Sequence, residues 1–208
     1  MLPCRPSRTL LILAVCGIVL SGCLGQQQSS RLYVLTPLPR TERAGPDAGS
    51  RGTAIGVGPV ELPQYTNRQQ IVTGNQSYQL HPATFDEWAE PLRDNFLRVL
   101  ADNLSILLAT DRVMLFPWKG PMAIEYQVVV DVTHFLGEVG GETSLVALWS
   151  IVGKNGQEVL LSQKSNVREA TGAQGYAALA EAMSHSLGAL SRDIAAAITT
   201  LSQRAATR

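Results

Sequence analysis

Alternation of apolar and polar residues predicts β-strands over much of the chain. The clearest case is 123–135, where apolar side chains at every second position share one face and polar side chains take the other. Segment 144–153 is apolar on both faces, so we expect a strand inside a sheet that is covered on two sides. Shorter apolar runs ended by proline, glycine or polar residues predict further strands at 31–38, 53–65, 112–118 and 157–169.

Two turn signals predict how some of these strands pair. Gly74-Asn75 divides 68–80 into the two arms of a hairpin. Asn155-Gly156 is typical of a type I′ turn, so the strands before and after it should be antiparallel neighbours.

Apolar residues at intervals of three and four predict a first helix. Six residues form this pattern: Leu92, Phe96, Val99, Leu100, Leu104 and Leu107. Thr84 and Glu87 have the spacing of a capping box, which would start the helix near residue 84. Pro91 suits a first helical turn, so either 84–89 is a separate turn or the helix is kinked there.

A second, longer helix is expected at about 173–202, with one continuous apolar seam. The seam steps alternately by four and three residues through Tyr176, Ala180, Met183, Leu187, Leu190, Ile194, Ala197 and Leu201. Such a seam is typical of a core helix that lies on a sheet. A sustained heptad pattern also suits helix pairing, so partial use in self-association, as in a homo-oligomer, is a second reading.

These elements predict an α/β fold of the α+β type. We expect a single domain in which a mixed, mostly antiparallel β-sheet packs against two long helices.

Residues 1–22 have the three parts of an export signal. Two arginines precede an apolar run at 10–20, and two small residues, Ser21 and Gly22, follow it. A membrane-spanning helix needs roughly twenty apolar residues, so this run is too short for a permanent anchor. A plain secretory signal and a short N-terminal membrane helix are the alternatives.

The sequence Leu20-Ser21-Gly22-Cys23 resembles the lipobox of bacterial lipoproteins. The thiol of Cys23 would carry a diacylglycerol thioether, and the amino group freed by cleavage would be acylated too. Several acyl chains hold a protein stably at a bilayer, whereas one chain holds it only marginally. We therefore expect 1–22 to be a lipoprotein signal peptide and 23–30 a lipidated tether.

Residue 24 is leucine rather than aspartate, which by the usual enteric sorting rule sends a lipoprotein to the outer membrane, facing the periplasm. The polar tether reaches at most about 25 Å. The folded part, 31–208, should therefore stay close to its membrane.

Composition narrows the classes of partner. The chain has 17 basic and 17 acidic residues, two of the basic ones within the signal, and no basic run. Nucleic acid is therefore excluded as an expected partner, because phosphate contacts need clustered lysine and arginine. Removal of the signal would leave Cys23 as the one cysteine, so we expect no disulfide.

No residue pattern indicates catalysis, and we expect no enzymatic activity, metal or cofactor. The three histidines, His81, His134 and His185, lack metal-ligand spacing. His134 falls on the apolar face of 123–135, where a hydrogen-bonded core histidine is the default. No Gly-x-Ser-x-Gly elbow is present, and "GVGP" at 56–59 lacks the third glycine of a dinucleotide loop.

Several stretches together resemble the PqiC-like ABC-type transport auxiliary lipoproteins. The most specific are "IGVGPVELPQYTNRQQIVT" at 55–73 and "WAEPL" at 88–92. Others that match in order and spacing are "YVLTP" after the lipobox, "RVLADNLSILL" at 98–108, "FPW" at 116–118 and the block from "VDVTHFLGE" to "ALW" at 130–149. The resemblance covers nearly all of 31–208.

This resemblance implies a non-enzymatic accessory protein held at the outer membrane. Its expected partner is an inner-membrane transport protein with MCE domains, which conducts lipids between the two membranes and supports envelope integrity. The resemblance carries no catalytic motif and no ligand residues. The alternative function is a periplasmic scaffold or regulator lipoprotein that acts on cell-wall or envelope-assembly enzymes.

Five residues are candidates for partner binding: Pro59, Pro63, Tyr65, Arg68 and Trp118. Prolines lower the entropy cost of ordering a loop, and Tyr, Trp and Arg dominate binding hot spots. The competing interpretation is that Tyr65 and Trp118 only cap the core. Trp88 and Trp149 are expected to be buried.

Overall fold

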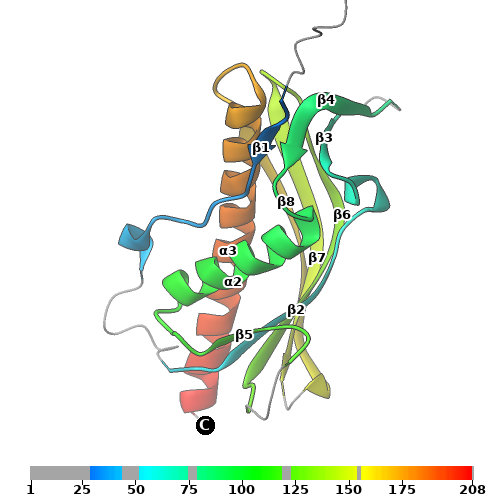
Figure 1. Ribbon diagram of the computed structural model, residues 1–208. Helices are drawn as coiled ribbons and strands as arrows, with labels where there is room; N and C mark the ends of the chain where they lie inside the picture. The colour runs from blue at the N-terminus through cyan, green and yellow to red at the C-terminus, as the bar shows by residue number, and fades with distance from the viewer. Residues whose placement is uncertain (1–28, 44–51, 75–78, 119–122, 154–155, 208) are drawn as a thin grey trace, which may run out of the picture. The chain divides into compact units, whose positions relative to one another are not determined.

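Two β-sheets and two long helices make up the fold (Figure 1). The structure is a computed structural model, and it describes residues 29–43, 52–74, 79–118, 123–153 and 156–207. Within these residues, Arg31 onward forms one unit of eight strands in two mixed sheets, of three and five strands. This confirms the predicted single domain of the α+β type. The signal, Cys23 and most of the tether lie outside the described residues.

The larger sheet has the order β5-β2-β6-β7-β8. Its strands are β2 (Ile55–Glu61), β5 (Val113–Leu115), β6 (Tyr126–Gly137), β7 (Glu142–Gly153) and β8 (Glu158–Ala170). β2 is parallel to β5 and β6, whereas β6, β7 and β8 form an antiparallel meander. The antiparallel pairing of β7 and β8 confirms the prediction made from the turn between them.

The smaller sheet has the order β1-β4-β3, with β1 (Arg31–Tyr33), β3 (Gln70–Thr73) and β4 (His81–Trp88). β3 and β4 form the predicted hairpin, although its second strand starts later than expected. The prediction that a helix starts near residue 84 was wrong, because β4 continues to Trp88. Its buried Asp86 accepts hydrogen bonds from Arg31 (2.7 Å) and Tyr33 (2.8 Å), which the local capping pattern does not reveal.

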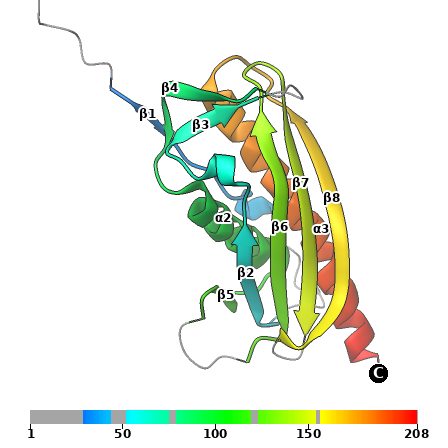
Figure 2. The ribbon, with the colours of Figure 1, turned by 90° about the vertical axis from the view of Figure 1, so that its right-hand side faces the viewer.

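Both helices, α2 (Leu92–Leu107) and α3 (Tyr176–Ala206), pack against the same face of the larger sheet (Figures 1 and 2). Figure 2 looks onto the opposite face, with α3 behind the strands. No described helix covers that opposite face, and Leu148 of β7 is 48% exposed there. The expectation that 144–153 is covered on two sides was therefore wrong, although β7 does lie inside the sheet.

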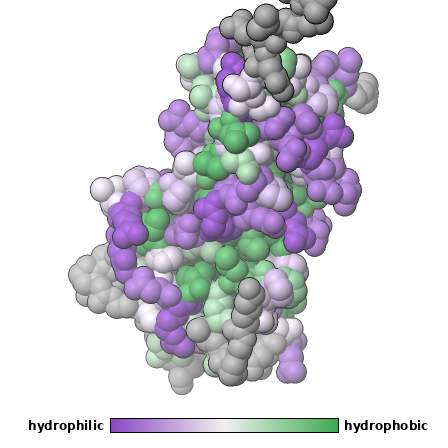
Figure 3. Space-filling model, in the orientation of Figure 1, coloured by the Kyte–Doolittle hydropathy of each residue, from purple (hydrophilic) through white to green (hydrophobic). Residues whose placement is uncertain are grey.

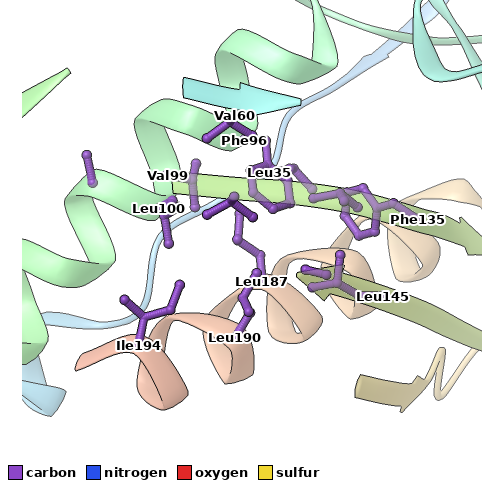
Figure 4. Close-up of a cluster of buried hydrophobic side chains, with 14 of the residues drawn as sticks. Leu35, Val60, Phe96, Val99, Leu100, Phe135, Leu145, Leu187, Leu190 and Ile194 are labelled. Atoms are coloured by element: carbon purple, nitrogen blue, oxygen red, sulfur yellow. The ribbon is translucent and has the colours of Figure 1, made fainter. Parts of the chain in front are cut away.

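The core forms where the inner rows of the sheet meet the two helices (Figure 4). Phe96 of α2 and Phe135 of β6 pack edge to face, with ring centroids 5.6 Å apart. Leu187 and Ile194 of the predicted α3 seam are fully buried in this cluster. The seam thus serves the protein's own core, and self-association remains a prediction that this seam does not support.

A β-bulge in β6 changes which residues face the core. The register of β6 against β7 shifts between Val132 and His134, so that Phe135 instead of His134 continues the buried row. His134 is half-buried on the outer face. The expectation of an inward-facing core histidine was therefore wrong, because regular alternation does not continue through the bulge.

The extended segment after β1 runs between α2 and α3 and is held by buried side chains. Asn95 of α2 accepts the Leu35 N–H (2.6 Å), and Asn103 accepts the Leu38 N–H (2.8 Å). Ser184 of α3 accepts the N–H of residue 36 (3.1 Å). We call these three side chains the strap clamp.

Leu187→Ala tests the α3 seam. Removing this fully buried side chain should lower the free energy of unfolding by about 2–5 kcal/mol, through lost burial and the cavity left behind. Denaturant unfolding would measure the loss. The matched control, Leu32→Ala on exposed β1, should change stability by less than about 0.5 kcal/mol. Equal losses at the two sites would contradict the assigned core.

Asn103→Ala tests the strap clamp. The buried Leu38 N–H would lose its acceptor, which should cost about 1–3 kcal/mol in the free energy of unfolding. The neighbouring Asp102 is exposed on the same helix, so Asp102→Ala should leave stability nearly unchanged. Hydrogen exchange should become faster at Leu38 in Asn103→Ala alone; unchanged protection there would refute the clamp.

Candidate functional site

A pocket of about 500 Å³ lies beside the short 3-10 helix η3 (Gln64–Thr66). The described residues that line this pocket come from two stretches of the chain, 61–69 and 88–94. These overlap the segments at 55–73 and 88–92, which carry the most specific part of the family resemblance. We call this cavity the η3 pocket and treat it as the candidate functional site.

Hydrogen bonds and prolines hold the two walls of the η3 pocket. Pro63 precedes η3, and the Thr66 hydroxyl donates to the Pro63 carbonyl (2.7 Å). The Trp88 N–H donates to the Gln69 carbonyl (2.7 Å), which joins the two stretches directly. Pro91 precedes α2 and has the fixed φ that suits a helix start. The walls are therefore stiff before any partner arrives.

Charged side chains of both signs surround the η3 pocket. Glu90 forms an ion pair with Arg98, and the Arg93 Nε atom lies 3.7 Å from the Asp94 Oδ1 atom. Arg68 is exposed, and no carboxylate of the described residues forms an ion pair with it. Its guanidinium is thus available for a carboxylate of a partner, the group that arginine binds best.

Tyr65 lies in η3, but its hydroxyl group is used inside the domain. The hydroxyl oxygen accepts the Phe135 N–H of β6 (3.1 Å), and the ring is about half-buried. Burial raises the pKa of Tyr65 above its ordinary value. Its predicted role in partner binding stays a prediction, yet removing its side chain would also disturb the fold.

Trp118 lies in a different place from Arg68 and Tyr65. Its ring packs over Gly56 near the start of β2, and it meets Phe116 edge to face at 5.5 Å. Gly56 has no Cβ, which leaves the space that the indole fills. η3, by contrast, follows the end of β2. The structure therefore does not gather the predicted binding residues into one site.

Pro59 and Pro63 are both half-buried, within β2 and before η3 respectively. They lead the chain from the region of Trp118 to the η3 pocket.

Leu115 and Phe116, next to Trp118, are 42% and 40% exposed. Figure 3 shows apolar side chains gathered on the face that carries α2 and β5. We call Leu115, Phe116 and Trp118 the β5 ledge.

The described residues contain no cluster of three or more histidine, cysteine, aspartate or glutamate side chains arranged to hold a metal ion. His81 and His185 are exposed on β4 and α3, whereas His134 is half-buried on β6. Where the chain is described, no helix has the length and hydropathy needed to cross a bilayer.

Sequence reasoning identified Arg68 but not the second wall of the η3 pocket. That wall, from Trp88 to Asp94, is distant in sequence and meets the first only through the packing of β4 and α2. One signal in the sequence could have indicated it: 55–73 and 88–92 are the two segments that resemble the family most specifically, which suggests that they act together.

Solved structures show the same fold. Protein XCC0632 from Xanthomonas campestris, described by the family model DUF330, aligns with a TM-score of 0.70 at 14% identity, over 86% of this chain and 100% of its own. An uncharacterized protein aligns with a TM-score of 0.65 at 19% identity, over 82% of this chain and 99% of its own. At these identities the likeness concerns the fold alone. No curated protein matches the chain.

The sequence itself identifies the family. The model of the family described as "ABC-type transport auxiliary lipoprotein component" matches residues 33–195, which is most of the chain. By this description, members of the family are auxiliary components of ABC-type transport. The chain belongs to the ABC-type transport auxiliary lipoproteins, a PqiC-like family.

Proposed function

We propose that this lipoprotein is a non-enzymatic accessory to an MCE-type intermembrane lipid transport system, and that it docks the inner-membrane conduit at the outer membrane. The observation that carries the proposal is the meeting of 55–73 and 88–92 at the η3 pocket. Two stretches that are far apart in sequence, and that mark the family most specifically, form one stiff surface with an arginine, Arg68, that pairs with no carboxylate of the described residues.

The proposed attachment to the outer membrane uses the N-terminal part of the chain. Signal residues 1–22 would be removed, Cys23 acylated, and Leu24 would permit sorting to the outer membrane. The tether up to residue 30 spans at most about 25 Å. A partner rooted in the inner membrane must therefore extend across the periplasm to reach the domain, as a long MCE conduit would.

The proposed docking surface combines the η3 pocket with Arg68. Its walls are held by prolines and backbone hydrogen bonds, so binding would cost little ordering entropy. Arg68 would pair with an acidic group on the conduit. The β5 ledge is a second, separate contact, because exposed aromatic and aliphatic side chains suit the apolar centre of an interface.

Cys23→Ser tests the attachment. Serine cannot form the thioether, so the variant should keep its precursor mass or leave the membrane fraction. Fractionation and radiolabelled palmitate would measure this. Cys16→Ser, within the signal, is the matched control and should be processed normally. Equal palmitate incorporation into Cys23→Ser and the unmodified protein would refute lipidation at this residue.

Arg68→Ala tests the docking surface. If Arg68 is a hot spot, its loss should weaken capture of the MCE-domain protein by at least about 2 kcal/mol. Arg204→Ala, an exposed arginine at the end of α3, is the matched control and should not change capture. Melting temperatures of both variants should stay near that of the unmodified protein, since Arg68 forms no ion pair among the described residues.

Photo-crosslinking in cells locates the surface independently. A photoreactive amino acid at position 68 or 118 should trap the MCE-domain protein, whereas one at exposed Ala196 of α3 should not. Trapping from 196 alone would place the contact on the helical face. Trapping from none of the three positions would refute the proposed partner.

A further inference from the structure

The strand β8 forms one edge of the larger sheet, and among the described strands it pairs with β7 alone (Figure 2). It has 13 residues, whereas β5 at the opposite edge has 3 and is soon followed by Pro117. A bulge at Leu160 interrupts β8 once, and residues 161–170 then pair with β7 without a break. Proteins usually shorten, kink or block an edge that stays free, because open amides attract another strand. The length and regularity of β8 therefore mark its open edge as a candidate interaction surface.

The hydrogen bonds beside β8 show which of its amides face outward. The Thr171 N–H, directly after β8, donates to the Gly141 carbonyl, directly before β7 (2.9 Å). Because successive amides of a strand point to opposite sides, the odd-numbered residues of 161–169 use their N–H and C=O groups on β7. The N–H and C=O groups of the even-numbered residues, from Ser162 to Ala170, point away from the sheet. A strand placed beside β8 would meet a regular row of donors and acceptors.

The same even-numbered residues turn their side chains to the outer face of the sheet, since they lie opposite outward residues of β7. Among them, Arg168 already forms an ion pair with Glu142 at 2.7 Å. Lys164 is exposed and forms no ion pair with a described residue. Asp131, in the same cross-strand row, lies two strands away on the far side of Leu148. Lys164 is thus the cation of this edge that is left for a partner.

The inner side of the edge offers a different chemistry. Leu161 and Val167 are half-buried there and pack against the margin of the core. Two acidic side chains lie on this side as well: Glu169, and exposed Asp193 of α3, which accepts a hydrogen bond from the Ser165 hydroxyl (2.6 Å). Apolar side chains of an added strand therefore suit the inner side, whereas a carboxylate turned inward would meet like charge.

A second copy of the chain fits this edge poorly. Antiparallel self-pairing would set the even-numbered residues of two β8 strands opposite each other. Every register that pairs most of residues 162–170 then places Lys164 or Arg168 opposite or diagonal to a basic side chain of the other copy. Like charges in these positions are destabilising. The edge thus favours a different strand, one whose outward side chains are acidic.

We propose that the open edge of β8 binds an extended segment of another protein, which adds to the larger sheet as an antiparallel strand. Acidic and apolar residues alternate in this segment. A carboxylate would lie opposite Lys164 on the outer face, and apolar side chains would lie beside Leu161 and Val167 on the inner side. In this mode of recognition backbone hydrogen bonds supply affinity and alternate side chains supply specificity. The edge shares no lining residue with the η3 pocket, so either surface can be tested without the other.

Peptide binding to the full-length lipoprotein, held in a lipid nanodisc, tests the proposal. A peptide that matches residues 161–170 in length and alternates glutamate with valine should bind saturably. A peptide in which lysine replaces every glutamate should bind at least about fivefold more weakly, because it sets like charges against Lys164.

Two N-methylated forms of the glutamate peptide locate its hydrogen bonds. In an antiparallel strand whose glutamates lie on the side of Lys164, the glutamate amides face β8 and the valine amides face away. N-methylation of the glutamates should therefore abolish binding, whereas N-methylation of the valines should leave it nearly unchanged.

Lys164→Glu tests the charge at the edge. It should weaken binding of the glutamate peptide by about fivefold or more and strengthen binding of the lysine peptide by a similar factor. Arg204→Glu, at the exposed end of α3, is the matched control and should change neither. Asn166→Pro removes an outward N–H and leaves the ladder with β7 intact. It should abolish peptide binding, while the melting temperature stays close to that of the unmodified protein.

Several results would overturn the proposal. They are no saturable binding of the glutamate peptide, equal effects of the two N-methylated forms, or equal effects of Lys164→Glu and Arg204→Glu. Loss of binding through N-methylation of the valines alone would contradict the placement of the glutamates opposite Lys164. A dimer in solution that is lost in Asn166→Pro would show that a second copy covers the edge, against the partner proposed here.

Discussion

Asn95 and Asn103 hold the backbone of an extended segment between the two helices, and the rest of the fold is organised around this contact. The segment from Leu35 to Leu38 belongs to neither sheet, so its buried amides need side-chain acceptors. The same Asn103 amide donates to Ser191 of α3 at 3.0 Å, so one side chain joins α2, the segment and α3. Polar groups at this depth are tolerated because each finds a partner. They set the distance between the helices, and therefore how both helices meet the sheet.

The sequence predicted the elements whose signals are local. The strands β6, β7 and β8 and both helices follow from the spacing of apolar residues. The antiparallel pairing of β7 with β8 follows from the Asn155-Gly156 turn signal. The errors concern effects that lie outside a local window. Thr84 and Glu87 of β4 have the spacing of a helix-start capping box, but the strand is held by Asp86, which accepts hydrogen bonds from Arg31 and Tyr33, more than 50 residues away in sequence. One inserted residue in β6 exchanges the faces of His134 and Phe135.

In the candidate site, too, the sequence predicted what depends on local signals and missed what depends on tertiary packing. Arg68 could be chosen from its residue type and its stiff proline-bounded loop, and it is indeed exposed at a pocket. Two other features depend on tertiary packing. The Tyr65 hydroxyl accepts a hydrogen bond from the Phe135 N–H, and Trp118 packs over Gly56 instead of beside Arg68. The apolar outer residues of β7 were read as a sign of double burial. They instead form part of an open surface, because a run that is apolar on both faces does not say what lies against each face.

The clamped segment also determines where mechanical load enters the domain. Residues 31–38 contact β4 through Arg31 and Tyr33, α2 through its two asparagines, and α3 through Ser184. Tension applied to the chain at Arg31 therefore meets a sheet and then two helices, and each of these contacts must break before residues 31–38 can be pulled free. A domain whose first residues are held in this way resists being unravelled from its N-terminal side.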